Sequence, residues 1–309
     1  MSMRHPITIP HHRWALVFAV LCLSLSAGAE TLPQVAPEDV GLSSQRLERL
    51  TDVMQLQEEG RLLIDDPVSR YLPEFAETTV AIDNENVEGY SVVPADRPIT
   101  IRDLLTHTAG IGYGPASDRW QAADIQKWYF AHREEPIRAT VERMADLPFR
   151  AHPGTQFVYG YNTDILGALI EVVADDPLDR FLQERILDPL GMEDTHFYLP
   201  RSKQDRLVTV YSASEEGGIE RAPDDGTMVS QGQYVEGPRT SFSGGAGLLS
   251  TAMDYARFQQ ALLNGGRLDG QRILSRKTVE LMTVDHLGHV EFPWMPGTGS
   301  DLDSPLPKT

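Results

Sequence analysis

The chemistry open to this chain is limited first by its nucleophiles. Cys22 is the single cysteine and lies in an apolar run near the N-terminus, so the rest of the chain has no thiol nucleophile, disulfide or cysteine metal ligand. A serine nucleophile needs a base within reach, and a lysine one helical turn further along is one such arrangement. No serine here is followed three residues later by lysine. Ser43 and Ser44, for example, precede Arg46 and Leu47.

Other reactive patterns are also missing. The sequence contains no Gly-x-Ser-x-Gly, no His-Glu-x-x-His and no P-loop, and the glycines at 110, 112 and 114 follow no predicted strand. We therefore expect no cofactor and no metal. His107 is expected to brace a loop, and His286 lies at a predicted helix end. Tyr159, between Phe157 and Tyr161, could by itself be one more packed aromatic side chain.

The first 29 residues predict a secretory signal peptide. Arg4 and Arg13 precede an apolar run at 14–26, and Ala-Gly-Ala at 27–29 fits a cleavage site. The run is shorter than the roughly 20 residues of a transmembrane helix. We therefore expect a periplasmic or secreted protein with no stable membrane span after cleavage; an uncleaved anchor is the alternative. The formal net charge of −18 argues against a nucleic-acid partner.

The elements that must position the reactive residues are mostly helical. Side-chain caps and apolar periodicity predict helices that begin at Ser43 or Ser44, Thr100, Asn162 or Thr163, Asp176-Pro177, Thr251 and Ser275. Segment 207–211 predicts a strand, and Glu216-Gly217-Gly218 a hairpin turn after it. The helix with Ile165, Leu169 and Val173 on one face should need a sheet to cover it. Residues 293–309 are poor in apolar side chains and predict a disordered tail.

Four stretches, in this order, resemble the serine hydrolases related to class C β-lactamases, and most closely their esterase branch. They are GRLLIDDPV at 60–68 with YLP at 71–73, ITIRDLLTHTAG at 99–110, PGTQFVYGYNTDILG at 153–167, and SGGAGLLST at 243–251. The resemblance implies a β-lactamase/transpeptidase-like α+β fold. It also implies one family domain over 30–292, in which mostly the helical domain is retained and the antiparallel sheet is incomplete.

The resemblance also implies a mechanism. In the family, the serine of Ser-x-x-Lys attacks an acyl carbonyl, the lysine takes its proton, and a strand near the end of the domain completes an oxyanion hole. The tyrosine of the second motif is proposed as general base and proton donor, and here that residue is Tyr159. Segment 51–54 resembles the opening helix of the family and 56–60 the tail of its nucleophile helix. The segment that carries Ser-x-x-Lys is missing between them.

Two hypotheses about function follow. The first is a serine hydrolase that acts on small-molecule esters or β-lactam-like amides. The second, favoured by the missing Ser-x-x-Lys, is a non-catalytic relative or binding remnant. The sequence predicts no particular partner protein.

Overall fold

The computed structural model describes residues 44–83, 90–113, 135–214, 217–223, 234–237 and 239–291. These residues form helices and short antiparallel strand pairs, so the protein has the α+β architecture expected from its sequence. The predicted signal peptide and the predicted disordered tail lie outside the described residues. None of the helices in the described part combines the length and the hydropathy needed to cross a lipid bilayer.

The elements follow one another in an order dominated by helices. The helical elements are α2 (Ser44–Glu58), η2 (Val68–Arg70), η3 (Pro73–Glu77), α3 (Ile101–Leu105), α6 (Ile137–Ala145), α7 (Asn162–Ala174), α8 (Leu178–Leu182), η4 (Gln183–Leu187), α9 (Asp188–Leu190), η5 (Arg201–Arg206), α10 (Ala252–Leu263) and α11 (Arg276–Met282). The strands are β1 (Thr79–Asp83), β2 (Tyr90–Pro94), β3 (Tyr211–Ala213), β4 (Ile219–Arg221), β5 (Arg267–Leu268) and β6 (Gln271–Arg272).

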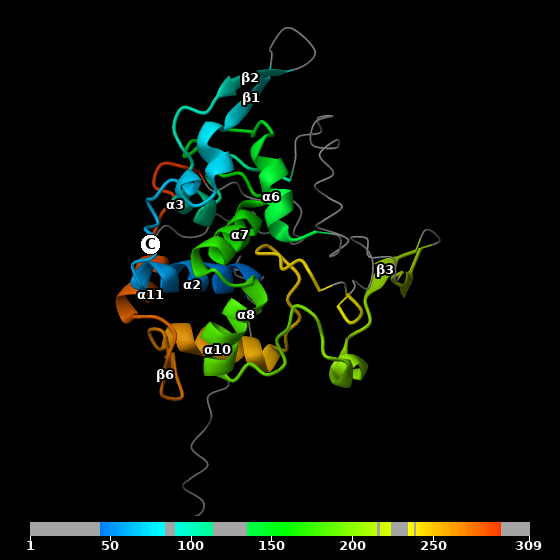
Figure 1. Ribbon diagram of the computed structural model, residues 1–309. Coiled ribbons are helices and arrows are strands. Elements are labelled where there is room, and N and C mark those ends of the chain that lie inside the picture. Colours follow the sequence, from blue (N-terminus) through cyan, green and yellow to red (C-terminus); the bar gives the residue numbers. More distant parts are fainter. Residues whose placement is uncertain are drawn as a thin grey trace, which may run out of the picture. The chain divides into compact units, whose positions relative to one another are not determined.

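Helix α7 is the buried centre of the helical core, with α2, α3, α6 and α8 packed around it (Figure 1). Ile165, Leu166 and Leu169 are completely buried. The expectation that this apolar face needs a sheet is wrong, because neighbouring helices cover it. A helix that is apolar around most of its circumference is stable when other helices surround it. The helical part of the fold therefore builds its own core.

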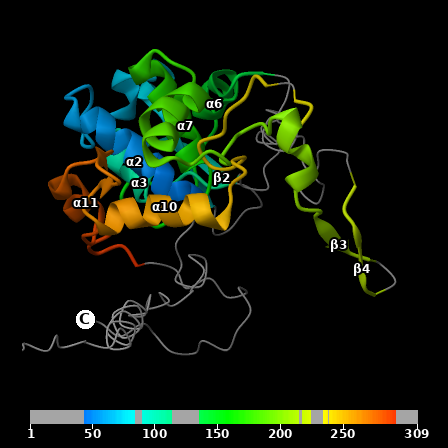
Figure 2. The ribbon, with the colours of Figure 1, turned by 90° about the horizontal axis from the view of Figure 1, so that it is seen from below.

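Helix α2 runs without interruption from Ser44 to Glu58, across the point where the sequence suggested two separate helix pieces. Val53, Met54 and Leu56 are buried on both sides of that point. The prediction that 56–60 is the tail of a second helix is therefore wrong. Helix α2 packs against α7 on one side and against α11 on another (Figure 2).

Side-chain caps fix where three other helices begin, as predicted. The Thr100 side chain accepts a hydrogen bond from the Asp103 main chain, and the Asp103 carboxylate accepts one from the Thr100 main chain. This reciprocal pair is a capping box, which satisfies two main-chain donors that the first turn leaves open. Thr251 and Ser275 cap α10 and α11 in the simpler one-bond form.

The strands form three separate antiparallel pairs among the described residues. In the first pair Val80 lies opposite Val93, and Val80 also forms a parallel bridge with Phe149. Val80 and Phe149 are buried, so this pair is fixed to the helical core. The sequence analysis missed this pair, because each strand has only five residues and the two strands do not follow one another across a short turn in the sequence.

The β3–β4 hairpin is present, but its ladder starts later than predicted. Tyr211 is the one residue of the predicted 207–211 strand that pairs in it. Gly217 and Gly218 turn the chain with φ of 83° and 141°, where glycine is favoured. Val208 and Ile219 are each more than three-quarters exposed (76% and 77%), so no buried face holds the longer predicted strand in register.

The burial of α7 yields a stability prediction. Replacing Leu169 by Ala should lower the free energy of unfolding by about 2–5 kcal/mol, because the truncation leaves a cavity in a packed core. Val172, on the same helix, is 42% exposed, and Val172→Ala should change it by about 0.5 kcal/mol or less. Urea denaturation of both variants measures this; equal losses would show that α7 is not enclosed.

Candidate active site

Two of the four family-like stretches lie side by side and are joined through their main chains. The Val158 amide donates to the His107 carbonyl at 2.8 Å, and the Gly154 amide donates to the Thr108 carbonyl, also at 2.8 Å. Further along the same two segments, the Arg150 amide donates to the Gly110 carbonyl at 2.9 Å. The loop after α3 and the segment before α7 are therefore one unit, and Tyr159 lies in it.

The ring of Tyr159 is half-buried within a cluster of aromatic side chains. Its centroid lies 5.1 Å from the centre of the His107 ring and 5.3 Å from that of Tyr113, which meets it edge-on. Tyr113 also meets Tyr161 edge-on at 4.8 Å. Such edge-to-face packing is favourable for aromatic rings and limits their rotation. The cluster therefore fixes the plane of the tyrosine ring while leaving part of the side chain accessible.

Asn162, the first residue of α7, supports this aromatic cluster and is completely buried. Its side-chain nitrogen donates to the Ile111 carbonyl at 2.9 Å and to the Val158 carbonyl at 3.2 Å, and lies 3.0 Å from His107 Nδ1. With two N–H groups for these three neighbours, the Asn162 nitrogen links the His107 ring to both carbonyls. His107 thus braces the loop, as predicted. Asn162 or Thr163 was predicted to cap α7, and this is wrong, because the helix starts at Asn162 and its cap position is Tyr161, with no side-chain cap bond.

Close main-chain contact at Gly160 explains why the residue after Tyr159 has no side chain. A Cβ there would lie 2.3–2.5 Å from main-chain atoms of Gly112 and Ile111. Any larger residue would push the Tyr159 segment away from the loop after α3. The two segments approach this closely because glycine stands at 160.

Asp103, in α3, anchors the loop after that helix, which carries His107. Its carboxylate accepts hydrogen bonds from Arg97 at 2.7 and 2.8 Å, from the Thr100 amide at 2.8 Å and from the Thr108 hydroxyl at 3.2 Å. Burial alone would raise the pKa of Asp103, but the hydrogen bonds from Arg97 and Thr100 outweigh it and hold the pKa below its usual value. Thr108 follows His107 directly, so this ionised carboxylate fixes the loop that supports Tyr159.

The glycine-rich turn at 243–246 docks on the first turn of α7. The buried Ser243 hydroxyl donates to Asp164 Oδ1 at 2.5 Å and accepts from the Gly245 and Ala246 amides at 3.0 and 2.9 Å. A Cβ on Gly244 would lie 1.9 Å from the Thr163 carbonyl oxygen, so this approach also requires glycine. Because its hydroxyl donates to Asp164 and accepts from two main-chain amides, Ser243 has a structural role rather than that of a nucleophile.

The structure therefore brings together the second family-like stretch, which carries His107, the third, which carries Tyr159, and the fourth, which carries Ser243. The sequence analysis missed Tyr113 and the roles of Asn162 and Asp164; the signal for the last two was a polar residue inside an apolar helix pattern. Ser43 lies outside the described residues. The described residues contain no group of three or more His, Cys, Asp or Glu side chains that could hold a metal ion.

The chain belongs to the Beta-lactamase family. The model of that family matches residues 51–295, which is most of the sequence. The matched region includes Tyr159, the Asn162 brace and the Ser243 turn, so the contacts described above belong to the family domain.

Individual relatives and one solved structure show which kinds of protein this chain is similar to. The chain is 36% identical over 234 residues to protein Rv1367c of Mycobacterium tuberculosis, a match over 76% of this chain and 56% of that protein. It is 33% identical over 260 residues to the lovastatin esterase of Penicillium rubens, over 81% of this chain and 61% of that enzyme. Among solved structures, EstCE1, a hydrolase with promiscuous acyltransferase activity, aligns with a TM-score of 0.59 at 27% identity, over 77% of this chain and 61% of that one. The chain thus spans somewhat over half the length of these curated relatives.

The pKa of Asp103 gives a pH-dependent prediction. A carboxylate whose pKa is lowered by folding adds stability above its unfolded pKa of about 3.9 and loses it as pH falls through the folded value. Asp103→Asn should therefore cost about 1–3 kcal/mol at pH 7, and the difference from the wild type should shrink below about pH 4.

Asp269→Asn is the matched control for this prediction, because Asp269 pairs with Arg257 at the surface. It should change stability by about 1 kcal/mol or less at either pH. Urea denaturation at pH 7 and at acidic pH measures both variants. A cost for Asp103→Asn that does not change with pH would contradict the ionised anchor.

Proposed function

We propose that the Tyr159 site is an acyl-transfer site for small-molecule esters or amides, in which Tyr159 transfers protons. The observation that carries this proposal is the way Tyr159 is held. Its ring packs against the rings of His107 and Tyr113. Asn162 contacts His107 and donates to the carbonyl of Val158, the residue before Tyr159. Proton transfer in a transition state requires a group held within hydrogen-bond reach of the reacting atoms.

The relatives support the substrate class. One is named for hydrolysis of an ester, lovastatin, and another is described as a hydrolase that also transfers acyl groups. Both reactions proceed through attack on an acyl carbonyl, and both need a proton removed from the attacking oxygen and delivered to the leaving group. We assign these two proton transfers to the Tyr159 hydroxyl.

We further propose that this chain by itself forms no acyl-enzyme. No serine in the sequence has lysine three residues later, and Ser243 is occupied by Asp164 and two main-chain amides. A serine hydroxyl without a base to take its proton is a weak nucleophile. This favours the second hypothesis, a non-catalytic relative, for the chain as it stands, while the Tyr159 framework is that of an acyl-transfer site.

The absence of an acyl-enzyme can be tested directly. Incubation of the chain with a fluorescent fluorophosphonate or a fluorescent penicillin, followed by a denaturing gel, should give no covalently labelled band. A serine hydrolase of the same family in a parallel tube controls for probe activity. A labelled peptide containing Ser43, Ser44 or Ser243 would contradict the proposal.

The role of Tyr159 can be tested in a chimaera that keeps residues 55–291 of this chain. An active member of the family that carries Ser-x-x-Lys would supply that segment before them and the final strands after them. We expect hydrolysis of a short-chain nitrophenyl ester. The nucleophile segment without the final strands should not suffice, because losing one oxyanion-hole donor costs a factor of about 10²–10³.

In that chimaera, Tyr159→Phe should lower kcat by a factor of about 10²–10⁴ with the fold intact, because it removes only the hydroxyl. Tyr113→Phe is the matched control: it removes a hydroxyl from the adjacent ring and should leave kcat within about threefold, well below what a proton-transfer role supplies. Nearly full activity of Tyr159→Phe would show that Tyr159 is a packing residue.

A further inference from the structure

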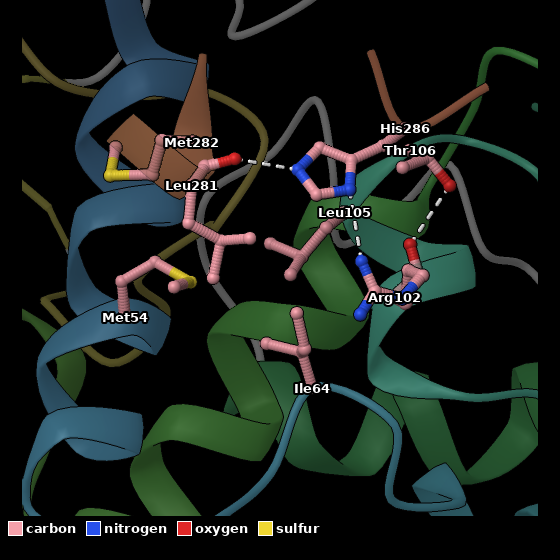
Figure 3. A pocket seen from close by; sticks show the side chains of 8 residues that line it. All are labelled: Met54, Ile64, Arg102, Leu105, Thr106, Leu281, Met282 and His286. Atoms are coloured by element: carbon pink, nitrogen blue, oxygen red, sulfur yellow. Dashed lines mark hydrogen bonds between the residues drawn. The ribbon is translucent and has the colours of Figure 1, made fainter. Parts of the chain in front are cut away.

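A cavity of about 120 Å³ lies between α2, α3, α11 and the turn after α2, apart from the Tyr159 cluster. Figure 3 shows the side chains of Met54, Ile64, Leu105 and Leu281 around a common space, with Arg102 and His286 together along one side. Met54 and Ile64 are buried and form the floor, while the others are partly exposed. Engineered apolar cavities of about 150 Å³ stay dry and bind molecules as small as benzene. This cavity therefore has room for one short aliphatic chain.

The polar side of the cavity is held rigidly. Arg102 donates from Nε and one terminal nitrogen to Asp65, at 2.8 and 3.3 Å, and its other terminal nitrogen lies 2.9 Å from His286 Nδ1. His286 Nε2 lies 2.7 Å from the Leu281 carbonyl oxygen, to which it can only donate. With Nε2 donating there, Nδ1 can accept from Arg102, and Asp65 and His286 together hold the guanidinium in one orientation.

The guanidinium retains donors beyond these contacts. It has five N–H groups, of which two go to Asp65 and one to His286. One N–H therefore remains on each terminal nitrogen without a partner among the described residues. Two N–H groups on adjacent nitrogens of one guanidinium match the two oxygens of a carboxylate. A permanently charged, oriented donor pair thus stands beside an apolar space.

We propose that this cavity is a binding site for a short-chain aliphatic carboxylate. The alkyl chain lies among Met54, Ile64, Leu105 and Leu281, and the carboxylate accepts from the two remaining N–H groups of Arg102. The two methionines of the lining, Met54 and Met282, are flexible side chains that adapt to the shape of an alkyl chain. The site is separate from Tyr159 and does not depend on the proposed acyl transfer.

Pentanoate is a suitable probe, measured with the full chain by calorimetric titration and by thermal unfolding at constant ionic strength. We expect saturable binding and a rise in Tm, both absent with pentylamine, which has the same chain and the opposite charge. Arg102→Gln should weaken binding about ten- to a hundredfold, the range expected for hydrogen bonds to a charged group. Asp65→Asn keeps the guanidinium and removes its competing carboxylate, so binding should be retained or become tighter.

Filling the cavity provides an independent test. Leu281→Phe places a larger side chain in the space and should abolish binding, whereas Val284→Phe, at a position 55% exposed outside the lining, should not. No saturable binding of pentanoate to the wild type, equal binding of pentylamine, or unchanged binding by Arg102→Gln would each overturn the proposal. If Leu281→Phe does not fold, the comparison of Arg102→Gln with Asp65→Asn decides.

Discussion

The described fold depends on the first turn of α7, where two buried polar side chains tie distant segments together. Asn162 bonds to the loop after α3 and to the residue before Tyr159, and Asp164 bonds to Ser243 and to the Gly245 amide. In a buried environment, these groups are costly if left unbonded and stabilising when satisfied. Because residues 165–170 of α7 are buried among other helices, this turn has little freedom to shift, and the segments around it must fit its position.

The family fold and the helix starts with local caps could be predicted from the sequence. Thr100, Thr251 and Ser275 each bond to a main-chain amide three residues later, so the information lies within one turn. The hairpin turn at Gly217-Gly218 is local in the same sense. Such features depend either on a side chain that bonds to a nearby main-chain group or on a glycine that adopts positive φ, and a pattern of residue types records both directly.

What could not be predicted depends on partners far away in the chain. Asn162 has the appearance of a helix cap, but its partners include His107, 55 residues earlier, and it begins the helix instead. Ser243 and Asp164 are 79 residues apart, and neither residue type alone indicates the other. Helix α2 is continuous because its buried stripe fits α7 and α11, whereas the sequence there resembles two pieces of a larger pattern. Tertiary packing decided each of these cases.

The supports of Tyr159 come from segments that do not include a nucleophile. The loop 107–113, the segment 150–167 and the turn 243–246 hold one another through hydrogen bonds and close glycine contacts. In this chain, the segments that orient Tyr159 are therefore held together without a nucleophile segment. If Tyr159 transfers protons as proposed, its orientation is supplied by the fold and requires no binding energy from the substrate.

The β3–β4 hairpin has a consequence for the protein in solution. Among the described residues its ladder has no third strand, and Val208, Tyr211 and Ile219 are exposed on it or beside it. Exposed apolar side chains gathered on a surface favour association between molecules. The formal charge of −18 opposes such encounters, and salt screens that repulsion within about 10 Å at 0.1 M. Association of copies through this hairpin is therefore expected to increase with ionic strength and with acidification, which neutralises the carboxylates that keep copies apart.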